Sequence, residues 1–189
     1  ASGEWYLAME YVPGVRWLEH LRPGGALASE AALRDALGQL AAGVHALHGA
    51  GLLHRDLKPS NVLVTPAGRV KIVDFGLAEL VAAGPEGAVV GTAGFLAPEL
   101  RRGEPASPAS DWYAVGVMLA LALTGRLPPH PLPDGPLADG APADLEALCR
   151  DLLAGRPDDR PRGEAVLRRL GRAPAPAALP TAFVGRARE

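Results

Sequence analysis

Four side chains that could take part in chemistry lie beside two short β-rich segments. Asp56, Lys58 and Asn61 precede the first segment, and Asp74 follows the second. In a hairpin that is symmetric about its turn, residue 61 lies opposite residue 74, so two oxygen donors from distant positions meet at one open end. Oxygen ligands suit a hard cation such as Mg2+. We therefore expect Asn61 and Asp74 to lie together, close to the carboxylate of Asp56 and the ammonium group of Lys58.

The hairpin itself is indicated by residue types. Residues 62–64 and 70–73 are rich in β-branched side chains, and the intervening 65–69 contains proline and glycine, which favours a short turn. Residues 4–12 predict another strand, which stops at the turn signal of Pro13 and Gly14.

Helices are predicted to pack beside this hairpin. Apolar residues recur at steps of three and four after Ser29, which predicts a helix with Ser29 as its N-cap. Residues 111–123 are almost all apolar, as expected of a helix that is covered on every side. Shorter helices are predicted at 145–153 and at 164–170.

Composition limits the classes of function. The 189 residues are 48% hydrophobic and 21% charged, which is typical of a globular domain. A net charge of -2 gives no support for nucleic-acid binding, and no apolar run reaches the roughly 20 residues that a membrane span needs. The single cysteine favours a reducing compartment, so we expect a cytoplasmic location. The first residues contain no initiator Met and no secretion signal, so we expect the chain to be part of a longer protein.

Three short motifs occur in order along the chain. They are His54-Arg55-Asp56-Leu57-Lys58-Pro59-Ser60-Asn61, then Asp74-Phe75-Gly76, then Ala97-Pro98-Glu99. Together they resemble the signature set of protein kinases, and Lys58 is typical of the eukaryotic-type (Hanks-type) serine/threonine branch. The resemblance implies an α+β, mostly helical fold: the C-terminal lobe of a kinase with a short catalytic-loop hairpin, and an incomplete N-terminal lobe.

The resemblance also implies a role for each polar residue. Asp56 would be the base that accepts the proton of a protein Ser or Thr hydroxyl, and Lys58 the cation at the transferred phosphate of ATP. Asn61 and Asp74 would bind Mg2+. Thr92 resembles the threonine that hydrogen-bonds the catalytic Asp and Lys in serine/threonine kinases.

A nucleotide site is implied near the start of the chain. The sequence YLAMEYVPG resembles the strand and hinge that hold adenine. Met9 would be the gatekeeper, the backbones of Glu10 and Val12 would hydrogen-bond the base, and Leu63 would form the apolar floor. An ordinary core strand with the same residue types would look alike.

Other residues are predicted to support the fold. Glu99 is expected to pair with Arg160, and Asp111 either to hold the backbone of the catalytic loop or to cap its own helix. We expect His48 to have no acidic partner and His54 to be a packing residue. Cys149 is expected to be part of the core.

The resemblance divides the chain into three parts. Residues 1–14 would be the last small-lobe strand and hinge, 15–172 the catalytic lobe, and 173–189 a Pro/Ala linker. The terminal FVGRARE resembles the opening of ATPase domains that follow some bacterial kinase domains. No glycine-rich phosphate loop, strand lysine or partner glutamate occurs before Glu4, so we expect the 189-residue chain alone to be a poor catalyst.

The sequence leaves two other functions open. A kinase-like fold could be a docking module that binds proteins and transfers nothing, although a pure scaffold has no need for Asp56, Lys58, Asn61 and Asp74 together. A small-molecule phosphotransferase is disfavoured, because such relatives generally lack the Ala-Pro-Glu segment and the Lys58–Pro59 pair.

Overall fold

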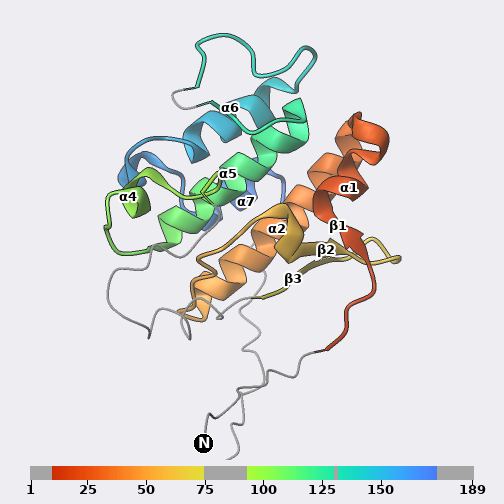
Figure 1. The fold of residues 1–189 in the computed structure, drawn as a ribbon, viewed down its shortest axis with the longest axis horizontal. Coiled ribbons are helices and arrows are strands. Elements are labelled where there is room, and N and C mark those ends of the chain that lie inside the picture. The colour runs from red at the N-terminus through yellow and green to blue at the C-terminus, as the bar shows by residue number, and fades with distance from the viewer. Residues whose placement is uncertain (1–9, 75–92, 130–131, 174–189) are drawn as a thin grey trace, which may run out of the picture.

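A computed structural model describes residues 10–74, 93–129 and 132–173. The fold consists of helices packed around α5, with a small sheet against α2 (Figure 1). In chain order the elements, with η for short 3-10 turns, are β1 (Val15–Arg16), α1 (Trp17–Leu21), η1 (Pro23–Gly25), α2 (Glu30–Gly49), η2 (Pro59–Asn61), β2 (Val62–Val64), β3 (Val70–Ile72), α4 (Pro98–Arg101), α5 (Pro108–Thr124), α6 (Ala143–Leu152), η3 (Pro157–Asp159) and α7 (Gly163–Arg169).

The predicted hairpin is present, but its register differs by one residue from the expected one. Val62 lies opposite Ile72, and Val73 N donates to Asn61 O at 2.9 Å, so residue 61 faces residue 73 and Asp74 lies one position further. The reason is the turn. Thr65 N donates to Arg69 O at 2.9 Å across a loop that ends in Gly68, whose φ of 72° is the left-handed conformation typical of such hairpins.

The strand predicted at 4–12 is wrong in the part that the structure describes, and residues 4–9 lie outside that part. Residues 10–12 are in no strand, and β1 begins later, at Val15, which lies opposite Val64 of β2. Gly14 explains the shift. A Cβ at Gly14 would lie 2.6 Å from Val64 O, so only glycine lets the chain approach β2 here.

The predicted helices are confirmed. Ser29 caps α2, because Ala32 N donates to Ser29 Oγ at 3.1 Å. Helix α5 begins at Pro108, earlier than predicted, because Ser107 and Ser110 form a capping box and proline suits the first helical turn. The two shorter predicted helices are present as α6 and α7.

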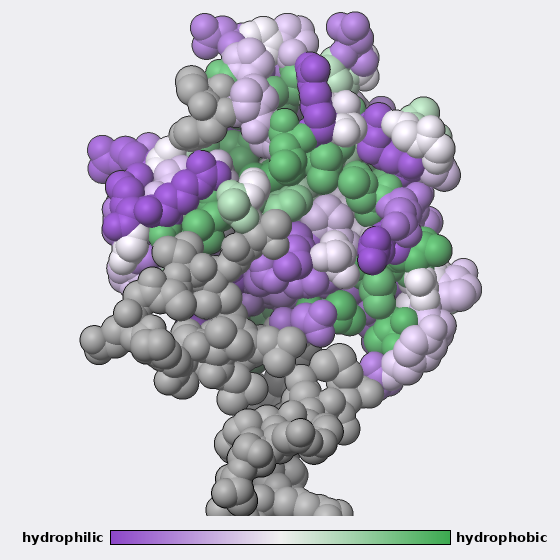
Figure 2. Space-filling view, viewed as in Figure 1, coloured by the Kyte–Doolittle hydropathy of each residue, from purple (hydrophilic) through white to green (hydrophobic). Residues whose placement is uncertain are grey.

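Helix α5 lies in the centre of the core, as its apolar sequence predicts. At Gly116 the helix contacts Leu152 and Leu153 so closely that a Cβ would lie 2.8 Å from Leu152 Cβ. On the face shown in Figure 2, hydrophobic side chains gather in the middle and hydrophilic ones surround them. No helix within the described ranges is both long and apolar enough to cross a membrane.

Candidate active site

The backbone of the loop before Asp56 is held by a carboxylate from α5. Asp111 Oδ2 accepts from His54 N and Asp111 Oδ1 accepts from Arg55 N, both at 2.9 Å. Arg55 has a φ of 67°, a conformation that costs energy in a non-glycine residue and needs such support. Of the two roles considered for Asp111, the structure shows the first, since Ser107 caps α5 instead.

The loop then brings three of the predicted residues together. Lys58 Nζ lies 2.6 Å from Asp56 Oδ2, and Asn61 Nδ2 donates to Asp56 O at 2.9 Å. Both charged side chains stay partly accessible, with 23% of Asp56 and 26% of Lys58 exposed. A carboxylate, an ammonium group and an amide are therefore fixed relative to one another at the surface.

His54 ties this loop to the end of β3. Its Nε2–H donates to Val73 O at 3.1 Å, and its Nδ1 accepts from Asp56 N at 3.3 Å. Burial lowers the pKa of His54, so the ring is neutral, with Nε2 as the hydrogen-bond donor and Nδ1 as the acceptor. The predicted packing role of His54 is confirmed, with these two hydrogen bonds in addition.

Asp74 lies at the same end of the hairpin as Asn61. Its φ of 59° turns the chain directly after the hydrogen bond between Val73 N and Asn61 O. The amide of Asn61 gives its N–H to the Asp56 carbonyl, which leaves Oδ1 as the end able to bind a cation; Ser60 Oγ lies 3.3 Å from it. Among the described residues no group of three His, Cys, Asp or Glu could hold a metal. An amide oxygen and a carboxylate are donor types that Mg2+ takes, commonly together with phosphate oxygens.

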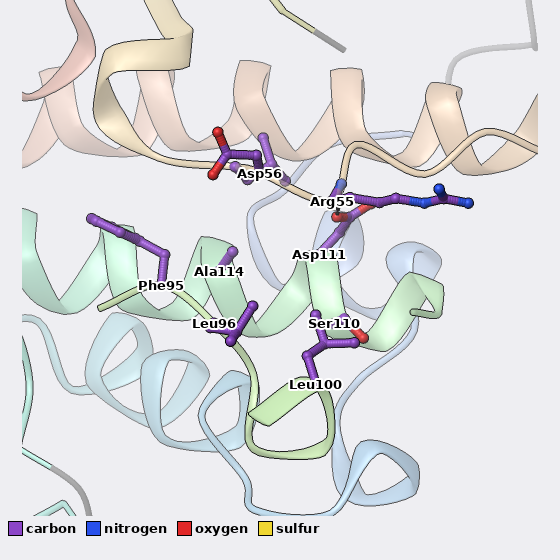
Figure 3. A pocket seen from close by; sticks show the side chains of 9 residues that line it. Arg55, Asp56, Phe95, Leu96, Leu100, Ser110, Asp111 and Ala114 are labelled. Atoms are coloured by element: carbon purple, nitrogen blue, oxygen red, sulfur yellow. Dashed lines mark hydrogen bonds between the residues drawn. The ribbon is translucent and has the colours of Figure 1, made fainter. Parts of the chain in front are cut away.

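A narrow cavity of about 10 Å³ lies beside Asp56 (Figure 3). Leu57 and Ala114 line it together with Phe95, Leu96 and Leu100 from the segment that includes the third motif. The side chains of Asp56 and Arg55 point in opposite directions from the loop, and Asp56 shares its side with Phe95. The segment around residue 95 thus lines the same cavity as Asp56.

A buried ion pair fixes this segment. Arg160 Nη1 and Nη2 lie 2.6 and 2.8 Å from the two oxygens of Glu99, and Ser110 Oγ donates to Glu99 Oε1 at 3.1 Å. Burial acts to raise the pKa of Glu99, but the hydrogen bonds from Arg160, from the backbone and from Ser110, together with the charge of Arg160, outweigh it, and the pKa lies below its usual value. The predicted pairing of Glu99 with Arg160 is confirmed.

The residues expected at the adenine are less fully described. Leu63 lies in the middle strand of the sheet, half-buried, on the face opposite to the buried Val62 and Val64. Glu10 is exposed and Val12 is half-buried. Met9 and Thr92 lie outside the described residues.

Residues 1–167 match a family model described as Protein kinase domain. The chain belongs to the protein kinase family. This kinase domain is 47% identical over 126 residues to serine/threonine-protein kinase PknA of Mycobacterium tuberculosis, which covers 65% of the chain and 29% of that protein. It is 31% identical over 183 residues to serine/threonine-protein kinase PknB of the same species, covering 86% and 29%. The chain thus spans less than a third of either relative's length.

Family membership confirms the predicted resemblance and the mostly helical α+β architecture. A further relative, from Corynebacterium efficiens and 43% identical over 126 residues, is also named a serine/threonine-protein kinase. The relatives' names thus agree with the serine/threonine branch that Lys58 indicates.

One supporting residue of the kinase domain was missed from sequence. His48 Nε2 lies 2.9 Å from Asp111 Oδ2, so the histidine expected to have no acidic partner has one. Its ring also makes an edge contact with Trp112. The available signal was its place on α2 beside the apolar face of Val44, since a half-buried imidazole there needs a polar partner.

Proposed function

We propose that the full-length protein is a serine/threonine protein kinase, which transfers the γ-phosphoryl group of ATP to hydroxyl groups of protein substrates. The loop geometry carries this proposal: Lys58 Nζ lies 2.6 Å from Asp56 Oδ2, and Asn61 Nδ2 donates to Asp56 O at 2.9 Å. Phosphoryl transfer needs a group that receives the hydroxyl proton and cations that offset charge on the phosphoryl oxygens. The loop supplies the first and part of the second.

Asp56 is the proposed base. Its carboxylate takes the proton of the substrate hydroxyl as the hydroxyl oxygen bonds to phosphorus and the bond to the leaving diphosphate breaks. Lys58 Nζ is close enough to this carboxylate to contact the transferred phosphoryl group at the same time. The substrate hydroxyl would approach on the side that Asp56 shares with Phe95 (Figure 3).

Asn61 and Asp74 are the proposed ligands of Mg2+, through Asn61 Oδ1 and the Asp74 carboxylate. The ion, bound with ATP, neutralises charge on the phosphates. In this proposal Met9, Glu10, Val12 and Leu63 hold the adenine, and Thr92 hydrogen-bonds Asp56 and Lys58. Support for these five assignments is the family resemblance alone.

The division into 1–14, 15–172 and 173–189, a following ATPase domain and a cytoplasmic location are also proposals. The ATPase domain rests on the short FVGRARE resemblance. The location rests on the use of ATP and on the single cysteine.

The test is a transfer assay on the full-length protein with γ-labelled ATP, Mg2+ and peptides that offer Ser, Thr or Tyr. We expect label on Ser and Thr, and a loss of turnover of about 10²- to 10⁴-fold in Asp56→Asn. Asp134→Asn, which changes an exposed aspartate between α5 and α6, is the matched control and should keep full activity. A protein that binds partners but transfers no label would support the docking module instead.

A further inference from the structure

The outer edge of the hairpin is held by a glutamine of α2. Val70 N donates to Gln39 Oε1 at 3.0 Å, and Gln39 Nε2 donates to Gly68 O at 2.9 Å. The same Nε2 also donates to Asp35 Oδ2 at 2.9 Å. One side-chain amide therefore binds both the end of the turn and the beginning of β3.

The strand pairing explains why this edge needs a partner. Strand β3 is the last strand of the sheet, and Val70 and Val64 form a pair whose N–H groups point away from each other. The flanking hydrogen bonds, from Thr65 N to Arg69 O and from Val73 N to Asn61 O, set this alternation. The Val70 N–H thus points out of the sheet, and Gln39 supplies the acceptor that an edge strand lacks.

The other end of β3 is seated on the same helix. Gly43 lies one turn after Gln39 on α2, and a Cβ there would lie 2.8 Å from Ile72 Cδ1. The side chain of Ile72 therefore packs into the space left by the missing side chain of Gly43. Strand β3 is thus fixed against α2 at two points, by a hydrogen bond at Val70 and by packing at Ile72.

Asp74 follows Ile72 by two residues, so its position depends on where β3 lies. The two parts of the proposed active site are then held by different helices: Asp111 of α5 holds the loop before Asp56, and α2 holds the strand before Asp74. A shift of β3 along α2 would strain the hydrogen bonds of Val73 to His54 and Asn61 and so displace Asp74, whereas the hydrogen bonds from the loop backbone to Asp111 do not involve β3.

We propose that Gln39 is a positioning residue for the proposed metal ligand Asp74. This inference rests on the proposed function, because it concerns the binding of Mg2+ with ATP. Gln39 does not touch the reacting groups. It sets the place of the strand that delivers Asp74, so its loss weakens metal binding before it affects the base Asp56.

Two substitutions of Gln39 distinguish the acceptor role of its side-chain amide from the donor role. Gln39→Met keeps the length of the side chain and removes every hydrogen bond, whereas Gln39→Glu keeps an acceptor for Val70 N–H and loses the donor to Gly68 O. Arg34→Met is the matched control, because Arg34 lies on α2 and bonds to Glu30 and Asp144 rather than to β3. Thermal melting of each variant gives its loss of stability.

Two readouts are made on the full-length protein. The first is the Mg2+ concentration for half-maximal phosphoryl transfer at saturating ATP, and the second is Mn2+ binding with a non-hydrolysable ATP analogue, followed by electron paramagnetic resonance. In Gln39→Met we expect both half-saturation concentrations to rise about fivefold to tenfold, with turnover at saturating metal within about twofold of wild type. Gln39→Glu should show a smaller rise, and Arg34→Met none.

Three results would overturn the inference. They are unchanged metal half-saturation in Gln39→Met, an equal rise in Arg34→Met, and a fall in turnover that saturating metal does not restore. If wild type transfers no phosphate but binds Mn2+, the proposed function fails, and the Mn2+ arm still decides the role of Gln39. If wild type binds no Mn2+, the inference fails too.

Discussion

Removing one partner of the buried ion pair between Glu99 and Arg160 should destabilise the fold strongly. The side chain of Arg160 is 0% exposed and that of Glu99 is 2% exposed, and Arg160 also donates to Ala154 O and Ala109 O at 2.9 Å. Arg160→Met leaves the Glu99 carboxylate buried without its cation. Such a loss costs about 3–5 kcal/mol of unfolding free energy.

The assay is urea unfolding of the 189-residue chain, followed by circular dichroism. For a slope of about 2 kcal/mol per M, this loss lowers the midpoint by about 2 M. The double variant Glu99→Met/Arg160→Met removes both charges and should recover much of the stability, because no unpaired charge remains. A double variant no more stable than Arg160→Met would show that the unpaired carboxylate does not cause the loss.

The pH dependence of the unfolding free energy provides a second test of this ion pair. Against burial, the hydrogen bonds and charge of Arg160, with hydrogen bonds from the backbone and Ser110, keep the folded pKa of Glu99 below its ordinary value of 4.5. The contribution of the pair is therefore complete above pH 4.5 and disappears as the pH falls through the folded pKa. In Arg160→Met the hydrogen bonds and the charge of Arg160 are lost, while burial still acts to raise the pKa of Glu99. The destabilisation of the variant relative to wild type should therefore shrink as the pH falls, and a constant difference would contradict this account.

Three further predictions concern the histidines and the cysteine. His48→Ala removes a hydrogen bond to the Asp111 carboxylate and should lower the unfolding free energy by about 2 kcal/mol. The control His45→Ala, in the helical turn before His48, should lower it clearly less in the same urea assay. Equal losses in the two variants would contradict the role of the hydrogen bond. Because burial lowers the folded pKa of His54, this residue should not reduce the unfolding free energy above pH 6.5. Below pH 6.5 the unfolding free energy should fall by up to about 1.4 kcal/mol per pH unit, and His54→Gln should flatten this dependence. An unchanged slope in His54→Gln would contradict this assignment. Burial raises the pKa of Cys149 to about 12, so a thiol reagent at pH 8 should modify it only on unfolding, and rapid labelling of the native chain would show that the thiol is accessible.

The sequence predicted best what depends on local patterns. The loop from His54 to Asn61 and the helix after Ser29 are continuous segments whose residue types limit the backbone. The sequence also predicts the buried helix, with a start later than the observed one at Pro108. Ser107 and Pro108 carry the start signal, but the apolar run at 111–123 is the more conspicuous pattern.

The remaining features depend on contacts between distant segments. The register of the hairpin follows from the turn that ends in Gly68, where one residue decides which side chain faces Asn61. The late start of β1 depends on the close approach of Gly14 to Val64. The partner of His48 on α5 and the partners of Gln39 in the hairpin lie far away in sequence, and no local pattern distinguishes a paired polar side chain on a helix from a solvated one.

The most direct test of the proposed kinase activity compares Asp56→Asn and Asp74→Asn in the full-length protein. Phosphoryl transfer to a Ser/Thr peptide and binding of ATP with Mg2+ are measured on the same preparations. We expect Asp74→Asn to abolish transfer and to weaken Mg2+-dependent nucleotide binding. Asp56→Asn should cut turnover by about 10²- to 10⁴-fold and leave that binding nearly unchanged. Equal loss of nucleotide binding in both variants, or full turnover in Asp56→Asn, would contradict the assignment of base and metal ligand.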